Sequence, residues 1–426
     1  MTNYVSRLKS RLFKTLLATF FVPGFLTAQD ATWKTIGVAD NSINTLISFE
    51  NKMFFGGRFS EFGGQTCLWA GYWDGKEIME NQVDIPGGGF NSFIIYKDQL
   101  FGIGSFNKGL KKWNGTLWEN AGDVGTSSSA LYTDGDTLFI GTDFGDLRAY
   151  VDGEGLVPGK MFSFGSNTSI GAITKYKGEL VVAGDIKDYN DVVVRRGGKW
   201  VPLNGGVRIK NPFKLFTFNG DLILIGDFDK SDKIPATGML TLSDTGWTAF
   251  AGGVTGDARS GVRDAFVYGP NLYVVGDFQK MDTIECKGGV ARWNGSQWFD
   301  LELNERLIDY PRAVTVSRGD IFVAVEGNQE HNIYRRSVLA SVEEPEMADI
   351  ELFPNPSSNS FQVNLLTGSD VLTGLRLVDM AGRTVMSFEQ LDQTNQIDIS
   401  ALQPGLYQVV VRSNSGTVYH KTLVKN

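Results

Sequence analysis

Apolar and polar positions repeat along the middle of this chain with a period of about 45 residues. In most copies a short apolar run is followed by glycine, a polar residue and an aromatic residue, and the last copy, Ile321–Gly327, has lost the glycine at this place. The fifth position of the pattern falls at Gly57, Gly104, Thr142, Gly184, Gly226, Gly276 and Val325. This spacing is the length of a four-stranded propeller blade, so the pattern predicts an all-β fold of seven similar units, a seven-bladed β-propeller.

Turn signals inside the units support the same interpretation. Asp-Gly or Asn-Gly pairs follow a tryptophan at 73–75, 113–115 and 293–295, and such pairs are strong hairpin signals. A further tryptophan follows the turn in several units, at Trp118, Trp200, Trp247 and Trp298. We expect this tryptophan to begin the outermost strand of a blade and to pack its ring between neighbouring blades.

The seventh unit lacks an outermost strand after Tyr334. A segment near the start of the chain, Asp30–Ile36 with Trp33, matches the missing piece. We therefore expect this N-terminal strand to complete the last blade and close the ring, which removes exposed strand edges. Six blades with an irregular extra set of strands is the alternative, because the third and seventh copies of the pattern are degenerate.

The C-terminal region carries several short motifs in a fixed order. The motif residues are Pro354, Asn355, Pro356, Asp379, Gly382, Arg383, Leu402, Gly405, Tyr407 and Lys421. This series resembles the type A C-terminal sorting domain of the type IX secretion system of Bacteroidetes. The resemblance implies a small antiparallel β-sandwich over residues 350–426, recognition by the type IX machinery, and cleavage in the linker that we place at 341–349.

The N-terminal 28 residues have the features of a signal peptide. Four basic residues precede an apolar run, Leu16–Leu26, that is too short to span a bilayer. Together the two signals predict a chain that passes through the periplasm and is secreted or held at the outer-membrane surface. Removing residues 1–28 would change the formal net charge from −8 to −12, which disfavours nucleic acid and anionic lipid as partners. No later apolar stretch has membrane-spanning length.

The repeat region, residues 29–340, also resembles kelch-like and galactose-oxidase-like propellers. Its inventory of reactive side chains is small: two histidines, His331 and His420, and two cysteines, Cys67 and Cys286. A Ser-His-Asp triad, a multi-histidine metal site or a copper site needs more imidazole than this, so the resemblance does not extend to copper chemistry. The cysteines fall ten residues after their repeat positions, and we expect them to be free thiols.

One series of polar residues is a candidate site. The residue after the fifth repeat position is acidic in five units: Asp143, Asp185, Asp227, Asp277 and Glu326. Five carboxylates at the same place in successive blades predict a binding face or a shared cation site, with calcium as the candidate cofactor. The alternative is that each carboxylate caps the turn that leaves the second strand. The neighbouring loops are also candidate contacts, with Tyr189 and Asp232 as examples.

Three hypotheses for function remain open from the sequence. The first is a secreted or surface-held binding module for a glycan, matrix or protein ligand. The second is an exported polysaccharide hydrolase or lyase that uses acidic loop residues, although no pair of carboxylates is singled out. The third is a structural element of surface adhesion.

Overall fold

The computed structural model describes most of the chain from residue 32 onward. The described ranges are 32–80, 82–83, 88–125, 127–158, 162–165, 167–228, 238–243, 246–255, 261–303, 310–327, 330–337, 350–365, 371–379, 384–388, 391, 396–403, 405–414 and 418–425. The predicted signal peptide, the linker, and the candidate residues Asp232, Gly382 and Arg383 lie outside these ranges. In the described part of the chain, no helix is long and apolar enough to cross a membrane.

Seven sheets of mainly antiparallel strands succeed one another along the described residues up to 337, and their strands are as follows. Sheet 1 contains β2 (Ile43–Phe49), β3 (Lys52–Gly57), β6 (Ala70–Trp73) and β7 (Ile78–Glu80). Sheet 2 contains β9 (Phe90–Tyr96), β10 (Gln99–Gly104), β11 (Leu110–Trp113) and β12 (Leu117–Gly122), with β8 (Gln82–Val83) parallel to β12. Sheet 3 contains β13 (Ser128–Thr133), β14 (Leu138–Thr142), β15 (Asp146–Val151), β16 (Gly155–Leu156) and β17 (Phe162–Ser163). Sheet 4 contains β18 (Ile170–Tyr176), β19 (Glu179–Gly184), β20 (Val192–Arg196) and β21 (Lys199–Pro202).

The remaining three sheets follow the same order. Sheet 5 contains β22 (Ile209–Phe218), β23 (Asp221–Phe228), β24 (Gly238–Ser243) and β25 (Gly246–Ala249). Sheet 6 contains β26 (Gly261–Tyr268), β27 (Asn271–Asp277), β30 (Val290–Trp293) and β31 (Trp298–Asp300). Sheet 7 contains β32 (Tyr310–Ser317), β33 (Asp320–Glu326), β34 (His331–Ser337) and β1 (Lys34–Ala39), extended by β4 (Glu61–Phe62) and β5 (Gln65–Thr66). A short hairpin, β28 (Lys280–Met281) and β29 (Ile284–Glu285), and two 3-10 turns, η2 (Lys187–Tyr189) and η3 (Leu203–Gly205), lie in the connecting loops.

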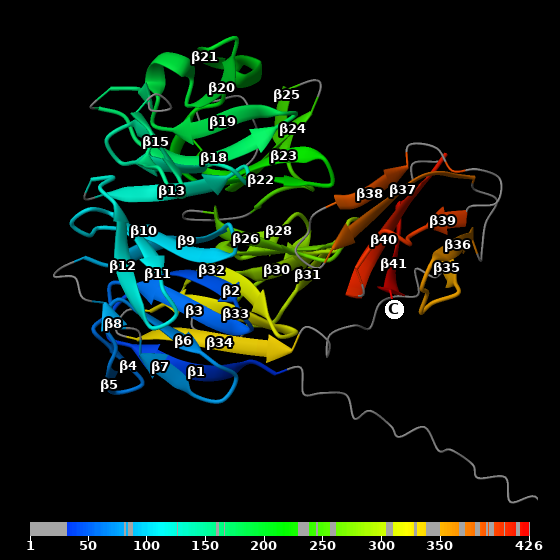
Figure 1. Cartoon of the computed structure of the whole chain (residues 1–426), viewed down its shortest axis with the longest axis horizontal. Helices are drawn as coiled ribbons and strands as arrows, with labels where there is room; N and C mark the ends of the chain where they lie inside the picture. The colour runs from blue at the N-terminus through cyan, green and yellow to red at the C-terminus, as the bar shows by residue number, and fades with distance from the viewer. Residues whose placement is uncertain are drawn as a thin grey trace, which may run out of the picture.

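The first strands of the seven sheets form a circle of contacts. β2 contacts β9, and the series continues through β13, β18, β22 and β26 to β32, which in turn contacts β2. The later strands of each sheet therefore lie progressively outward, and the molecule is a propeller-like ring of sheets (Figure 1).

The N-terminal strand completes sheet 7, as the sequence predicts. β1 pairs antiparallel with β34, with Thr35 opposite Tyr334 and Ala39 opposite His331. The indole nitrogen of Trp33 donates a hydrogen bond to the carbonyl of Leu301, 2.7 Å away, at the end of sheet 6. The first and last parts of the ring are thus joined by strand pairing and by a half-buried side-chain hydrogen bond.

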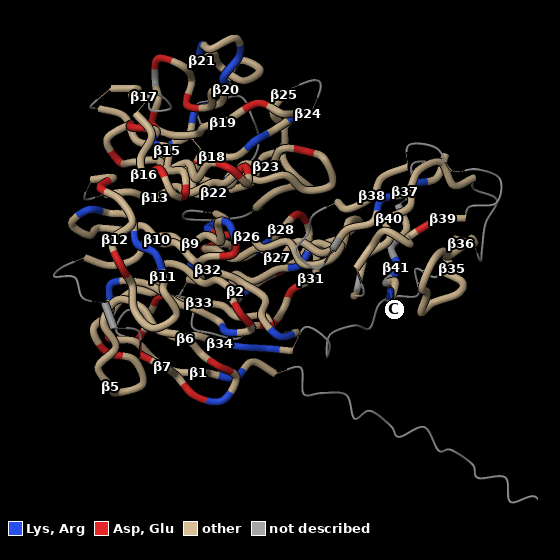
Figure 2. Tube along the Cα trace, in the orientation of Figure 1, with Lys and Arg blue, Asp and Glu red and all other residues tan. Residues whose placement is uncertain are grey.

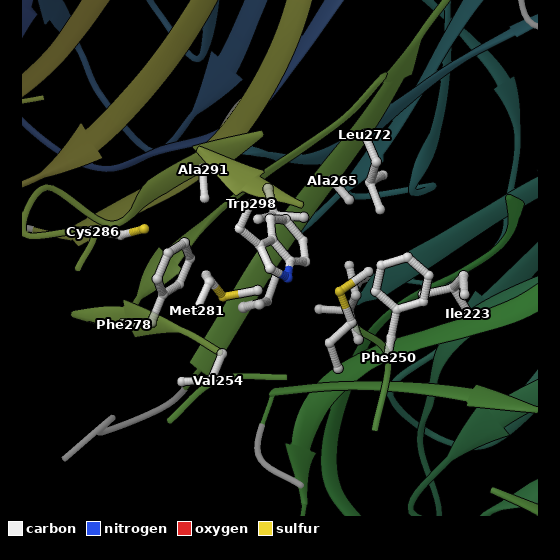
Figure 3. Close-up of a cluster of buried hydrophobic side chains, with 14 of the residues drawn as sticks. Ile223, Phe250, Val254, Ala265, Leu272, Phe278, Met281, Cys286, Ala291 and Trp298 are labelled. Carbon is white, nitrogen blue, oxygen red and sulfur yellow. The ribbon is translucent and has the colours of Figure 1, made fainter. Parts of the chain in front are cut away.

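The predicted packing of the outer tryptophans is also confirmed. The indole of Trp298 donates to the carbonyl of Ala251 at 2.9 Å, and that of Trp247 donates to the carbonyl of Leu203 at 3.4 Å. Each bond joins the outer strand of one sheet to the segment that follows the outer strand of the preceding sheet. Figure 3 shows Trp298 beside Met281 and Phe250 in the apolar core shared by sheets 5 and 6.

The C-terminal region forms two further sheets. One contains β35 (Ile350–Phe353), β36 (Ser360–Leu365) and β39 (Gln396–Asp398); the other contains β38 (Thr384–Phe388), β37 (Leu372–Asp379), β40 (Gly405–Ser413) and β41 (Val418–Lys425). All strand pairs within them are antiparallel. Val363 of the first sheet and Leu377 and Val409 of the second are buried in one common core, which gives the sandwich that the sequence predicts.

Candidate functional site

A β-bulge occurs at the same place in the first strand of every sheet. At this place each strand has one residue that is skipped in the pairing register: Asn44, Asn91, Ser129, Gly171, Phe213, Arg263 and Arg312. β22 has a second such residue, Lys210. All seven are half-buried, and in each case the residue before the bulge is buried. Because these strands are the innermost ones, the bulged residues lie at the inner edge of their sheets. Bulges commonly re-aim a side chain next to a functional site.

We call this part of the ring the bulge end. It consists of the seven bulged residues, the residues that follow the fifth repeat position, and the loops beside them. Its composition is uneven around the ring. Sheets 1 to 3 contribute two asparagines and a serine, whereas sheets 5 to 7 contribute a phenylalanine and two arginines.

Three bulged side chains donate hydrogen bonds to the first strand of a neighbouring sheet. Arg312 donates from Nη1 to Oδ1 of Asn44 at 2.9 Å, and Asn44 donates from Nδ2 to the carbonyl of Phe90 at 3.0 Å. Asn91 donates from Nδ2 to the carbonyl of Ser128 at 3.1 Å. These bonds connect sheet 7 to sheet 1, sheet 1 to sheet 2, and sheet 2 to sheet 3.

A second set of bonds continues the connection through sheets 5 and 6. Lys214 donates from Nζ to Oδ1 of Asp264 at 2.7 Å, and Oδ2 of Asp264 accepts a hydrogen bond from the backbone N–H of Val314 at 3.0 Å. Sheets 5, 6 and 7 are joined in this way. Hydrogen bonds between neighbouring sheets therefore hold Asn44, Asn91 and Arg312 of the bulge end, and Lys214 and Asp264 beside it.

The bulge end has an arginine stacked on aromatic rings at sheets 5 to 7. The guanidinium carbon of Arg263 lies 4.8 Å from the ring centroid of Phe213 on sheet 5 and 5.9 Å from that of Tyr310 on sheet 7. All three side chains are half-buried. Both contacts are within the range of cation–π attraction, so two rings hold the guanidinium plane.

The five predicted carboxylates lie at the bulge end, and several bind side chains of the first strand of their own sheet. Asp143 accepts hydrogen bonds from the hydroxyls of Ser127 and Ser129, the second at 2.8 Å. Asp227 accepts from Nδ2 of Asn211 at 3.1 Å, and Glu326 forms an ion pair with Arg312. These contacts give a structural reason for an acidic residue at this position, and the binding role of the five carboxylates stays a prediction.

The other two carboxylates occupy equivalent places. Asp277 ends β27 and lies opposite Gly261, and Asp185 follows β19; both are half-buried. Within the ranges that the structure describes, no three His, Cys, Asp or Glu side chains come together in a group that could hold a metal ion. The structure therefore does not gather the five carboxylates at one point, and the calcium site stays a prediction.

Tyr189 and the two cysteines pack in apolar clusters, and the two histidines lie in paired strands. Tyr189 lies in η2 and packs edge-on against Phe164, with 6.2 Å between ring centroids. Cys67 and Cys286 are buried free thiols, and burial raises the pKa of each to about 12. His331 lies opposite Glu326 in the strand pairing, and His420 opposite Val410 in the C-terminal region.

The C-terminal motif residues hold the sandwich together. Oδ1 of Asn355, between two exposed prolines, accepts a hydrogen bond from the backbone N–H of Val424 in the last strand at 2.8 Å. The hydroxyl of Tyr407 donates to the carbonyl of Gln403 at 2.8 Å, and Asp379 lies opposite Tyr407 across the sheet. Leu402 packs against the common core.

Two motif residues are surface positions of the same sheet. Lys421 lies opposite Val409 on β41 and is exposed, and Gly405 begins β40 and is exposed. Pro354 and Pro356, on either side of Asn355, are exposed as well. The motif thus combines residues that stabilise the sandwich with residues that a secretion receptor can reach.

The bulged residues are the part of the site that the sequence interpretation did not identify. Their spacing along the chain is regular. Each bulged residue lies thirteen positions before the fifth position of its repeat. Their residue types differ from sheet to sheet, so a search for repeated residues passes over them.

Comparison with known proteins assigns the C-terminal region to a family. For the ring of sheets, it shows similarity of fold alone. Residues 351–425 match the family of secretion system C-terminal sorting domains, the tail that directs type IX export. No curated protein matches the chain in sequence.

Solved structures share the fold at low sequence identity. The chain resembles two B. thetaiotaomicron extracellular domains assigned to hybrid two-component systems, BT4673 (TM-score 0.51, 12% identity, 92% of this chain and 58% of that one) and BT3049 (TM-score 0.50, 10%, 93% and 58%). It therefore spans less than two thirds of the length of either domain. The WD40 β-propeller domain of Doa1 scores 0.47, with 14% identity over 71% of this chain and 96% of that domain.

Proposed function

We propose that this chain is a type IX secretion substrate that acts at the cell surface or outside the cell as a binding module. In this proposal residues 1–28 are a signal peptide, residues 29–340 form a seven-bladed β-propeller with kelch-like repeats, and residues 341–349 link it to the sorting domain. The bulge end is the recognition face, and its ligand is a glycan, a matrix component or a protein.

The observation that carries the proposal is the sorting domain at 351–425, because a chain that bears it is a substrate of the export machinery. Two features of the ring support a binding role. Three of the bulged side chains, Asn44, Asn91 and Arg312, form hydrogen bonds to neighbouring sheets, which lowers the entropy cost of binding through them. The likeness to extracellular domains of Bacteroides is consistent with a role outside the cell, although it concerns the fold alone.

The first experiment is a glycan and polysaccharide binding screen on the chain without residues 1–28, run with calcium and again with a chelator. We expect binding without turnover. Binding that disappears with the chelator would support a cation at the carboxylates, and absence of any ligand among glycans and isolated surface proteins would contradict the binding role.

The position of the ligand is tested by a bulky label at either end of the ring. Both native cysteines are buried with raised pKa values, so a maleimide-linked polymer reacts selectively with one introduced cysteine. Lys108→Cys lies in the loop after β10 at the bulge end, and Asp98→Cys lies in the turn between β9 and β10 at the other end. Both positions are exposed with positive φ, at 61° and 57°. We expect the label at position 108 to block binding and the label at 98 to leave it unchanged; the reverse result would move the recognition face.

A further inference from the structure

Trp69 holds a backbone conformation that bulky residues rarely adopt. It precedes β6, the third strand of sheet 1, and has a φ of 65°. The residue before the third strand also has a positive φ in sheets 3, 4 and 6, where it is Gly145, Asp191 and Gly289. Glycine adopts this conformation without steric cost, and the carboxylate of Asp191 accepts two backbone hydrogen bonds. Tryptophan has neither advantage, and strained residues of this kind cluster at ligand-binding sites and switch regions.

Backbone hydrogen bonds place Trp69 beside Arg58. The N–H of Gly57 donates to the carbonyl of Trp69 at 2.9 Å, and the N–H of Trp69 donates to the carbonyl of Phe59 at 3.0 Å. Gly57 and Phe59 flank Arg58, which is the residue after the fifth repeat position of sheet 1. Arg58 and Trp69 therefore belong to the same small part of the bulge end.

The indole of Trp69 is only partly covered. Its ring packs against the apolar cluster that contains Phe90 and Phe106 of sheet 2, and the residue is half-buried. Leu68 beside it is 42% exposed. The indole nitrogen is not buried, and no described residue accepts a hydrogen bond from it. Such a ring can pack on the apolar face of a sugar, and its N–H can donate to a hydroxyl.

Arg58 supplies a cation that the protein itself does not pair. Its side chain is exposed, and no hydrogen bond or ion pair joins its guanidinium to a described residue. Its stem lies against the start of sheet 2, since a Cβ atom built on Gly89 would lie 2.9 Å from Cγ of Arg58. The donors of this guanidinium are available to a ligand, and their planar fork matches the two oxygens of a carboxylate.

The charge of the bulge end differs around the ring. The residue after the fifth repeat position is Arg58 in sheet 1 and Ser105 in sheet 2, whereas it is acidic in the other five sheets. Lys108, in the loop after β10, is a second exposed cation of sheet 2. Acidic and basic residues are interspersed along the chain trace as a whole, so this difference is local (Figure 2). An anionic ligand is therefore favoured at sheets 1 and 2 over the sheets that carry the carboxylates.

We infer that the bulge end at sheets 1 and 2 binds a saccharide unit that carries a carboxylate. The guanidinium of Arg58 donates hydrogen bonds to the carboxylate, and the apolar face of a sugar ring packs on the indole of Trp69. This role accounts for a tryptophan at a position where other sheets have glycine or aspartate. The inference rests on the proposed function, since it names the ligand class for the same recognition face.

The test is calorimetric titration of the chain lacking residues 1–28 with tetragalacturonic acid and with its fully methyl-esterified form, which has the same rings without the charges. We expect the acid to bind at least about 10-fold more tightly than the ester, because a hydrogen bond to a charged group contributes more than one to a neutral group. Arg58→Gln should abolish this preference by weakening binding of the acid alone. Arg58→Lys should recover part of it, since lysine keeps the charge but lacks the planar fork.

Trp69→Gly separates the role of the ring from that of the charge. We expect it to weaken binding of acid and ester alike by about 10-fold, so the ratio of the two affinities stays the same. Glycine occupies the equivalent position in sheets 3 and 6, so the substitution suits the backbone conformation. Circular dichroism and melting temperature confirm that each variant is folded.

The matched control is Arg195→Gln. Arg195 is also exposed and has no hydrogen bond or ion pair from its guanidinium to the described residues. It lies on β20 near the turn to β21, at the end of the ring opposite the bulge end. Binding by this variant should stay within about 2-fold of the parent, because salt screens a distant exposed charge.

Several results would overturn the inference. Equal affinity of the Arg58→Gln variant and the parent for the acid would remove Arg58 from the site, and the same result for Trp69→Gly would remove Trp69. Binding of the ester as tightly as the acid, or of a neutral glycan or peptide carboxylate with no affinity for the acid, would assign another ligand class while leaving a binding role. Absence of any ligand in the screen of the previous section would instead contradict the proposed function itself.

Discussion

The glycine that occupies the fifth position in five of the seven repeats is required by the close approach of two strands. A Cβ atom built on Gly184 would lie 1.8 Å from the carbonyl oxygen of Ser169, and one on Gly104 would lie 1.9 Å from that of Gly89. Neither glycine has a positive φ. The lack of room for a Cβ atom, rather than the backbone conformation, therefore makes glycine necessary at this position. The first strand comes this close because of its bulge.

We predict that Gly184→Ala lowers the free energy of unfolding by about 1–3 kcal/mol, the usual cost of forcing an extra carbon into a packed site. The measurement is urea denaturation. Gly122→Ala is the control, since a Cβ there has no neighbour nearer than 3.4 Å, and its cost should stay below about 1 kcal/mol. Similar losses for both variants would refute the close-approach explanation.

Lys111 is a fully buried lysine in the second sheet. Its ammonium group donates hydrogen bonds to the carbonyl of Asn107 and to Oδ1 of Asn120. Burial, helped by the nearby charge of Lys108 and opposed by that of Asp123, lowers its pKa to about 8. The unfolded chain keeps the ordinary lysine pKa of about 10.4, so the folded state releases this proton first.

We predict from this that the wild type gains stability relative to Lys111→Met between about pH 8 and pH 10.5. In that window the unfolded state binds more protons than the folded state, so raising the pH favours folding. Below about pH 8 Lys111 is protonated in both the folded and the unfolded state, so the full cost of burying its charge lowers the stability of the folded state. The measurement is the difference in unfolding free energy between the two proteins as a function of pH. A difference that stays constant across the window would show that Lys111 titrates normally.

At the scale of elements, successive sheets are joined by hydrogen bonds from one sheet to the sheet before it. The outer tryptophans bond to carbonyls of the preceding sheet, and β1 supplies the outer strand of sheet 7 from the start of the chain. Hairpin β28–β29 follows the same rule, because Asp282 donates its backbone N–H to the carbonyl of Gly253 beyond sheet 5. The ring is therefore stabilised by neighbour contacts, and β1 adds strand pairing at the junction where β32 contacts β2.

We predict that deletion of residues 29–36 from the chain lacking its signal peptide lowers the melting temperature by many degrees and promotes oligomers. The deletion removes Trp33 and half of β1, and it leaves the edge of β34 open for pairing with another chain. Melting curves and size-exclusion chromatography measure the two effects. An unchanged melting temperature and a monomeric profile would contradict closure by β1.

At the scale of the whole molecule, the chain combines two units with different tasks. The sandwich at 350–425 has its own apolar core, and its sequence motifs match the sorting family. The ring has shared cores between successive sheets and an uneven set of side chains at its bulge end. The bulged positions hold residues as different as glycine and arginine in sheets of the same fold. Residues at this end of the ring can therefore differ from sheet to sheet without loss of the fold.

Several features followed from the sequence alone, because they depend on local spacing. The apolar repeat and its turn signals predicted the strands, and the unmatched Trp33 segment predicted the N-terminal strand beside β34. The C-terminal motifs predicted the sorting domain. Each of these features is carried by residues close together in the chain or by a pattern copied from unit to unit.

Only the tertiary structure decided what the repeated positions do. The series of carboxylates suggested a shared cation site, but their partners are side chains of the adjacent first strand, such as Ser129 for Asp143 and Arg312 for Glu326. The stacking of Arg263 on rings from two other sheets joins residues about 50 positions apart, and it depends on the circular order of the sheets. Spacing along the chain determines strands and turns, whereas the meeting of side chains from different sheets is determined by packing.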